Sequence, residues 1–311
     1  MTESAAHRES LPLDSTAQLL TRITTQLGTQ LRHVSLNGTR RPMTPPTHPP
    51  THLPTHQPTH PPRPPSPPAL VAVAHGSRDP MALRTVTTLL ERVRELRPGL
   101  DVRLGHIELN EPLLPDTLAD IGPGAAVLVP LLLSRGYHVK QDLPQAAATA
   151  PHLRIRIATP LGPHPLLVEA LYARLTEAGW RTSDATHPGS GVVLAAAGSR
   201  DPQSAADTRR TAAMLSARLG GVPVVPAYAS AASPTVPEAL RALAARGRHR
   251  TAVASYFTAP GRFAAQSAAA APWIASAPLG THPALARLLL LRYDQALATR
   301  SPAPRRQLAS A

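Results

Sequence analysis

The sequence predicts an α/β protein of two similar lobes, each with a parallel sheet of about four strands and helices on both faces. From Leu70 onward, short apolar runs alternate with segments of helical pattern, which is typical of parallel sheets. Gly-Ser-Arg-Asp-Pro occurs at 76–80 and again at 198–202, each time after an apolar run. PLGPHP at 160–165 matches PLGTHP at 278–283. Matches that recur in one order indicate an internal duplication.

The elements of the first lobe follow from this alternation. The run from Leu70 to Ala74 predicts a buried strand, and Asp79 followed by Pro80 predicts a helix start, with an N-cap side chain and proline at the first helical position. The later apolar runs predict strands and the segments between them helices. We expect strands at 70–74, 101–107, 125–133 and 153–158, and helices at 80–96, 112–121, 139–149 and 165–178.

The second lobe repeats this series after a loop at 180–190. Pro112 pairs with Pro234 in the second helix of each half, and Gly136 pairs with Gly261 after the third strand. We expect strands at 191–196, 222–228, 251–257 and 273–277, and helices at 202–219, 234–246, 261–271 and 283–298.

The regions outside the lobes differ in composition. We assign the chain to a disordered extension rich in proline, threonine and histidine (1–68), the N-terminal lobe (69–180), the C-terminal lobe (190–300) and a flexible tail (301–311). Residues 42–68 hold 13 prolines in 27 positions, which cannot form a core. Four histidines recur within this tract: His48, His52, His56 and His60. They either bind metal ions with low affinity or are low-complexity sequence without a function. Met43 is an alternative translation start.

The composition excludes several classes of protein. The chain has no cysteine, which excludes disulfides and iron–sulfur clusters held by cysteine and is consistent with a cytoplasmic protein. Lys140 is the only lysine and has no glycine-rich context, so we expect no Walker A loop and no nucleotide. No apolar run reaches about 18 residues, so we expect no membrane span, and the N-terminus has no signal-peptide core.

The positive charge has two interpretations. The net charge is +13, and residues 241–311 carry ten arginines against one acid, Asp294. The pattern is either a solvated arginine-rich surface or a means of attracting an anionic partner. Aromatic residues make up only 3% of the chain and no nucleic-acid-binding motif appears, so we expect no nucleic-acid partner.

Polar side chains follow the first three strands of the first lobe. His75 follows the first strand, Glu108 the second and His138 the third, so all three belong to one edge of the sheet. The second lobe has Ala197, Ser230 and Phe263 at the matching positions. His106 is a rival to Glu108, but in an extended strand it points to the other face. Two imidazoles and a carboxylate suit a divalent first-row metal with open coordination positions, and they also suit proton removal.

Three motifs carry a resemblance to a known family. AHGSRDP, IELNEPLLPDTL and VPLLLSRGYHVKQDLP, in this order from Ala74 to Pro144, resemble the sirohydrochlorin chelatases, the class II chelatase family of CbiX/SirB type. The resemblance covers about 70–298 in two copies. It implies that two histidines and a glutamate line a cleft between two α/β lobes and insert a divalent metal into a tetrapyrrole without ATP.

The resemblance places these roles on particular residues. The metal-ligating and catalytic set falls on His75, Glu108 and His138, and the second half lacks all three, which implies one site per chain. An anionic tetrapyrrole implies carboxylate-binding groups, for which we select Ser77, Arg78, Arg135 and Tyr137; among the arginines, Arg135, Arg200 and Arg262 are weaker candidates than Arg78. For Ser77 and Asp79, capping is the competing interpretation, because both recur in the second half.

The expected function is that of a cytoplasmic, monomeric chelatase. Its metal is a substrate, Fe²⁺ for siroheme or Co²⁺ for cobalamin, because the ligand set suits both ions. The alternative is a metal-binding or metal-delivery protein that uses the histidine-rich tail and the three-ligand site without acting on a macrocycle.

Overall fold

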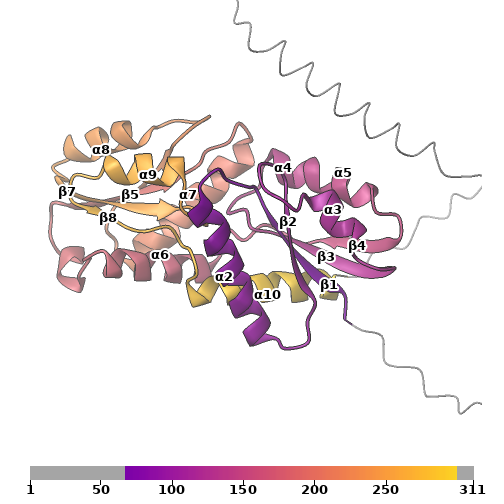
Figure 1. The fold of residues 1–311 in the computed structure, drawn as a ribbon. Coiled ribbons are helices and arrows are strands. Elements are labelled where there is room, and N and C mark those ends of the chain that lie inside the picture. The colour runs from indigo at the N-terminus through magenta and orange to yellow at the C-terminus, as the bar shows by residue number, and fades with distance from the viewer. Residues whose placement is uncertain (1–66, 300–311) are drawn as a thin grey trace, which may run out of the picture. The chain divides into compact units, whose positions relative to one another are not determined.

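The computed structural model describes residues 67–299, which form two four-stranded parallel sheets flanked by helices (Figure 1). The strand order is β2-β1-β3-β4 in the first sheet and β6-β5-β7-β8 in the second. The predicted fold class is therefore confirmed. The predictions for the proline tract, its four histidines, Met43 and the C-terminal tail lie outside the described residues. None of the described helices is long and apolar enough to cross a membrane.

Strands and helices alternate along the chain as the sequence predicts. The strands are β1 (Ala69–Ala74), β2 (Val102–His106), β3 (Gly124–Pro130), β4 (Leu153–Ile157), β5 (Ser190–Ala196), β6 (Val224–Tyr228), β7 (Arg250–Tyr256) and β8 (Ile274–Ala275). The helices are α2 (Pro80–Leu96), α3 (Leu114–Ala119), α4 (Tyr137–Lys140), α5 (Asp142–Ala148), α6 (Pro165–Glu177), α7 (Pro202–Arg218), α8 (Val236–Ala244), α9 (Arg262–Ala269) and α10 (Pro283–Ala298). A 3-10 turn, η1 (Thr182–Ala185), lies between the two repeats.

The helix expected at 139–149 is divided in two. Helix α4 ends at Lys140, and α5 begins at Asp142 after an interruption at Gln141. Pro144 gives the physical reason, because a proline in a helix interior lacks an N–H and collides with the carbonyl four residues earlier. The break places Pro144 in the first turn of α5, where proline is tolerated.

The repeated Gly-Ser-Arg-Asp-Pro segment forms the same turn in both repeats. Asp79 accepts a hydrogen bond from the backbone N–H of Met81 at 2.9 Å, and Asp201 accepts one from Gln203 at 2.9 Å. The hydroxyl oxygens of Ser77 and Ser199 each accept the N–H of the following aspartate at 3.1 Å. The shared residues therefore serve as a turn and a helix cap, as their recurrence predicts.

The apolar core consists of three clusters of buried residues. The faces of the two sheets that carry α3 with α5 and α8 with α9 have separate clusters. The other two faces share one continuous cluster, to which α2, α6, α7 and α10 contribute. Two smaller cores thus flank one large core common to both repeats.

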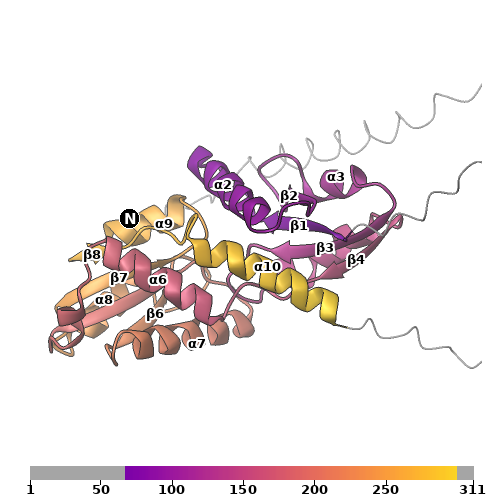
Figure 2. The ribbon, with the colours of Figure 1, turned by 90° about the horizontal axis from the view of Figure 1, so that it is seen from below.

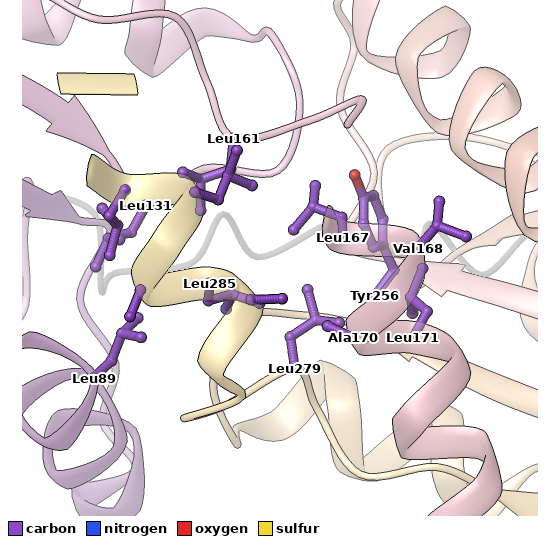
Figure 3. Close-up of a cluster of buried hydrophobic side chains, with 14 of the residues drawn as sticks. Leu89, Leu131, Leu161, Leu167, Val168, Ala170, Leu171, Tyr256, Leu279 and Leu285 are labelled. Carbon is purple, nitrogen blue, oxygen red and sulfur yellow. The ribbon is translucent and has the colours of Figure 1, made fainter. Parts of the chain in front are cut away.

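Helices α6 and α10 are exchanged between the sheets. Helix α6 follows β4 in the chain but packs against α7 and β7, whereas α10 follows β8 and packs against α2 and β3 (Figure 2). In Figure 3, α10 with Leu285 lies between Leu89 and Leu131 on one side and Leu167 of α6, which is beside Tyr256, on the other. From the sequence, each helix is expected to belong to the repeat that precedes it, whereas each of these two packs against the sheet of the other repeat.

Two equivalent arginines, one on each exchanged helix, bind the segment before the other helix. The guanidinium of Arg174 on α6 donates to the carbonyl of Leu279, just before α10, at 3.3 and 3.1 Å. The guanidinium of Arg292 on α10 donates to the carbonyl of Leu161, just before α6, at 2.9 Å. The two contacts are equivalent under the duplication, so each exchanged helix anchors the segment that leads into the other.

Candidate metal-binding site at the edge of the first sheet

The strand order creates a place for a ligand beyond β1 and β3. The chain passes from β1 to β2 on one side and then to β3 on the other side of β1. In open parallel sheets, ligands bind outside the carboxyl ends of the strands at such a reversal. His75 directly follows β1, and α4 follows β3 after a loop. The predicted site residues of these two segments therefore belong to this edge.

His75 and Glu108 lie together there. The Nδ1 atom of His75 is 3.5 Å from Oε1 of Glu108, and their side chains are 44% and 54% exposed. Their backbones are also joined, because the N–H of Glu108 donates to the carbonyl of His75 at 3.0 Å. An imidazole and a carboxylate at this spacing, both open to solvent, present two ligand types suited to a divalent metal.

His138 is the second residue of α4. Its side chain, like that of Tyr137, lies outside the described side chains. Among the side chains that the structure does describe, no group of three histidines or carboxylates is close enough to hold a metal. The structure thus brings two of the three predicted ligands together, and His138 remains a prediction placed by its backbone.

His106 has a structural position. It is 2% exposed, and its Nδ1 lies 3.1 Å from the carbonyl oxygen of Pro112. Burial lowers the pKa of its imidazole, because the charged form loses its hydration. The partner and the burial explain this histidine without a metal, which leaves Glu108 as the solvent-open candidate beyond β2.

Asn110 lies at the candidate site and was not among the residues expected there from the sequence. Its side-chain oxygen accepts the backbone N–H of Ser77 at 2.7 Å, and its own N–H donates to the carbonyl of Glu108 at 2.8 Å. It therefore links the turn after His75 to the loop that carries Glu108. A signal was present, since the second repeat has Ala232 at this position.

Arg135, predicted to bind substrate, is engaged with a partner. Its backbone N–H and its Nε donate to Oδ2 of Asp207 at 3.1 and 2.9 Å, and Nη2 donates to Oδ1. Burial acts to raise the pKa of Asp207, but the hydrogen bonds from Arg135 outweigh it, so the pKa lies below its ordinary value. The other two described residues of the predicted set, Ser77 and Arg78, lie in the turn before α2, where Ser77 has the capping contact and Arg78 is exposed.

The second repeat keeps the backbone contacts of this site but lacks its histidine and glutamate side chains. The N–H of Ser230 donates to the carbonyl of Ala197 at 2.9 Å, which is the pairing seen between Glu108 and His75. A Cβ built on Gly261 would lie 3.7 Å from the Ser77 hydroxyl, and one built on Gly136 would lie 3.6 Å from the Ser199 hydroxyl. The loop after the third strand of each repeat therefore approaches the helix-capping turn of the other.

Solved chelatase structures share this architecture. A structure described as SirB from Bacillus subtilis with Fe³⁺ superimposes with a TM-score of 0.60 at 25% identity, covering 74% of this chain and 95% of that one. A structure described as CbiX, the terminal enzyme for biosynthesis of siroheme in denitrifying bacteria, superimposes with a TM-score of 0.55 at 22% identity, covering 74% of this chain and 100% of that one. The second likeness supports the fold alone.

Curated relatives are similar over part of the chain. A sirohydrochlorin cobaltochelatase of Methanococcus aeolicus is 36% identical over 25% of this chain and 56% of its own length. A sirohydrochlorin ferrochelatase of Bacillus subtilis is 29% identical over 55% of this chain and 66% of its own length. A sirohydrochlorin cobaltochelatase of Methanopyrus kandleri is 31% identical over 35% of this chain and 96% of its own length. This chain thus spans less than two thirds of the first two relatives.

The family comparison covers both repeats. The family model described as CbiX matches residues 69–178 and, separately, residues 191–296. The matches coincide with the two sheets and with the duplication seen in the sequence. This chain therefore belongs to the CbiX family of sirohydrochlorin chelatases.

Proposed function

We propose that this chain is a sirohydrochlorin chelatase, a lyase that inserts Fe²⁺ or Co²⁺ into an anionic tetrapyrrole without ATP. The observation that carries the proposal is the pair of His75 and Glu108, whose Nδ1 and Oε1 lie 3.5 Å apart at the carboxyl edge of the first sheet. The second repeat has the same backbone pairing but an alanine and a serine at these positions. The two side chains are thus not needed to build the turn, which favours a chemical role.

Insertion exchanges two pyrrole protons for one divalent ion. A neutral imidazole at His75 offers a nitrogen lone pair, which binds the incoming ion or accepts a proton. The carboxylate of Glu108 binds the ion directly or orients the imidazole through Nδ1. His138, at the start of α4, is the proposed third ligand. Three side-chain ligands leave coordination positions open, so that pyrrole nitrogens can replace water and the ion can leave the protein.

Basic groups near the site suit the carboxylates of the substrate. Arg78 is exposed in the turn directly after His75 and Gly76. Arg262 opens α9, whose preceding residue, Gly261, approaches Ser77. Guanidinium groups bind carboxylates through paired hydrogen bonds, which would hold the macrocycle from its rim. Arg135 is the weaker choice, since Asp207 already takes its donors.

The cellular setting follows from the same proposal. The chain lacks cysteine, which suits a reducing compartment and agrees with the cytoplasm. Its two repeats supply two sheets within one chain, and the large shared core joins them. We therefore propose a cytoplasmic monomer.

The test is metal insertion by purified full-length protein. Four histidines of the N-terminal tract are replaced by glutamine in every variant, so that they do not contribute metal binding: His48, His52, His56 and His60. Sirohydrochlorin is supplied with Co²⁺ or with anaerobic Fe²⁺, and the absorbance change on metallation gives the rate. We expect His75→Ala, Glu108→Ala and His138→Ala each to lose at least about 100-fold in kcat, a loss typical of acid–base and ligand residues.

The second repeat supplies the matched control. Ser230→Ala is the counterpart of Glu108→Ala and should keep the wild-type rate, because no ligand is removed. Near wild-type rates in the His75→Ala and His138→Ala variants would contradict the assignment. Tight Co²⁺ binding without any insertion would contradict chelatase activity and would support the metal-delivery alternative.

A further inference from the structure

The segment that carries His138 is attached to the second repeat at three points. The hydroxyls of Ser134 and Ser204 lie 2.8 Å apart. Arg135 donates three hydrogen bonds to Asp207 through its backbone N–H, Nε and Nη2. At the other end of α4, Nζ of Lys140 pairs with Oδ2 of Asp201 at 2.5 Å. Contacts from α7 and from its N-cap, Asp201, therefore hold the chain on both sides of His138.

The three partners lie in one row, Ser204 and Asp207 on α7 and Asp201 at its N-cap. Asp201, Ser204 and Asp207 are spaced three residues apart, which places them on the same side of a helix. Asp207 and Ser204 are buried, at 3% and 4% exposure. A buried carboxylate is unfavourable unless charged hydrogen bonds compensate it, and an apolar pair of similar volume often gives equal stability. Burial of the Asp207 carboxylate is therefore poorly explained by stability alone, whereas Asp201 also caps α7.

The equivalent contact in the other direction, between α2 and the loop before α9, lacks these polar side chains. Helix α2 has Ala82 and Thr85 where α7 has Ser204 and Asp207. The loop before α9 has Ala259 and Pro260 where the first repeat has Ser134 and Arg135, and Ala265 replaces Lys140. Glycines approach serines in both directions, so the two loops have similar surroundings. Among the described side chains, these polar contacts occur at the segment that carries a predicted metal ligand and not at its counterpart in the second repeat.

We propose that α7 of the second repeat positions α4, with Asp207 and Asp201 as positioning residues for His138. The inference rests on the proposed function, because it takes His138 as a ligand of the metal. The repeat without ligands then contributes to the metal site by fixing where the third ligand stands. Residues that orient a metal ligand are commonly worth 10-fold to 100-fold in metal affinity.

Two substitutions test the contact, one at each end. Asp207→Asn keeps an oxygen acceptor but removes the charge that binds Arg135. Asp201→Asn removes the charge that binds Lys140 while keeping an N-cap side chain for α7, since asparagine caps as well as aspartate. In the full-length protein with the tract histidines replaced, we expect each variant to bind Co²⁺ at least about tenfold more weakly by calorimetric titration. Loss of ligand should also weaken the visible band of bound Co²⁺.

An ion pair between η1 and β7, in which the carboxylate is buried and the arginine is half-exposed, is the matched control. Asp184 is 5% exposed, accepts the N–H of Arg181 and pairs with Arg250 at 2.9 Å, which resembles the environment of Asp207. Asp184→Asn should lose similar stability but keep wild-type Co²⁺ affinity. Lys140→Arg keeps a cation for Asp201 and should behave as wild type, whereas Lys140→Gln should match Asp201→Asn.

A double-mutant cycle separates positioning from general loosening of the fold. If Asp207 acts through His138, Asp207→Asn should add less than a twofold change in Co²⁺ affinity once His138 is alanine. A full additive loss in that background would overturn the inference. Unchanged affinity in Asp201→Asn and Asp207→Asn, with His138→Ala impaired, would overturn it while leaving the proposed function standing. An unimpaired His138→Ala variant would instead reject His138 as a ligand. If Asp207→Asn fails to fold, Asp201→Asn and Lys140→Gln decide the same question.

Discussion

A methyl group on Gly76 would lie 1.8 Å from the carbonyl oxygen of Glu108, closer than any side-chain carbon can approach. The backbone of Gly76 has a φ of +104°, which L-residues with a side chain rarely adopt. Gly198 repeats both properties, with a φ of +92° and 1.8 Å to the carbonyl oxygen of Ser230. The close approach of the first turn to the loop after β2 places His75 beside Glu108.

Gly76→Ala is therefore expected to destabilise the protein by about 2 kcal/mol or more, because the left-handed backbone and the steric collision both oppose it. Gly198→Ala should lose a similar amount, while only Gly76→Ala also weakens Co²⁺ binding. Gly99→Ala separates the two causes, since its φ is +83° but nothing lies within 4 Å of the added carbon. Urea unfolding measures the losses. Equal midpoints for Gly76→Ala and wild type would contradict the steric argument.

The caps of the two exchanged helices should make stability depend on pH. Nδ1 of His164 accepts the N–H of Leu166, and Nδ1 of His282 accepts the N–H of Ala284, both at 3.2 Å. Burial, followed by nearby arginines, lowers the pKa of both imidazoles below the ordinary value of about 6.5. The folded state therefore binds fewer protons, so this stability is present above about pH 6.5 and is lost as the pH falls toward the folded pKa.

Asparagine at both positions tests that dependence, because it caps a helix without titrating. The free energy of unfolding of His164→Asn/His282→Asn, measured by urea titration from pH 7.5 to 5, should fall less steeply than that of wild type. His249→Asn, at an exposed histidine, controls for loss of an imidazole and should keep the wild-type slope. An unchanged slope in the double variant would show that these caps do not contribute.

Asn110→Ala should weaken catalysis more than stability. It leaves the N–H of Ser77 without its 2.7 Å acceptor and frees the loop that carries Glu108. A single hydrogen bond contributes about 1 kcal/mol to folding, and the second repeat folds with Ala232 at this position. We expect a loss of about tenfold in kcat with little change in KM, together with a small shift in thermal midpoint. A change in KM alone would instead assign Asn110 to substrate binding.

Ala197→His should not create a second metal site. Ser230 and Phe263 still stand where the other two ligands would be needed, although the backbone frame is retained. Stability should change by no more than the roughly 1 kcal/mol typical of point substitutions. Equilibrium dialysis against Co²⁺ should find one ion per chain in both proteins once the tract histidines are replaced. Two ions per chain would show that one imidazole suffices for binding.

Local signals explain why most elements could be predicted from the sequence. Helices α2 and α10 have the bounds expected for them, because Asp79-Pro80 and His282-Pro283 combine a cap with a proline at the first helical position. The break before α5 was missed, although Pro144 carries the information, because the apolar pattern continues across it. Comparison of the repeats selected His75 and Glu108, which the structure brings together, and the same comparison would have found Asn110.

Contacts between segments far apart in the sequence could not be predicted from these local signals. The apolar faces of α6 and α10 show that each helix is buried but not against which sheet, so the exchange could not be inferred from periodicity. Arg135 similarly had the charge expected of a carboxylate-binding group. Its partner Asp207 lies 72 positions away along the chain, and no local pattern connects them. The position of His138 beside the other ligands stays a prediction.

The exchange of α6 and α10 governs when the protein can finish folding during translation. The first sheet and α2 emerge from the ribosome early, yet the helix that covers them beside α2 is α10, the last helix of the described chain. Until α10 emerges, Leu89 and Leu131 lack the neighbour that completes their core. Nascent chains that end before Pro283 should therefore remain sensitive to protease within the first sheet. Cleavage of the backbone between the repeats should likewise not yield two independently stable fragments.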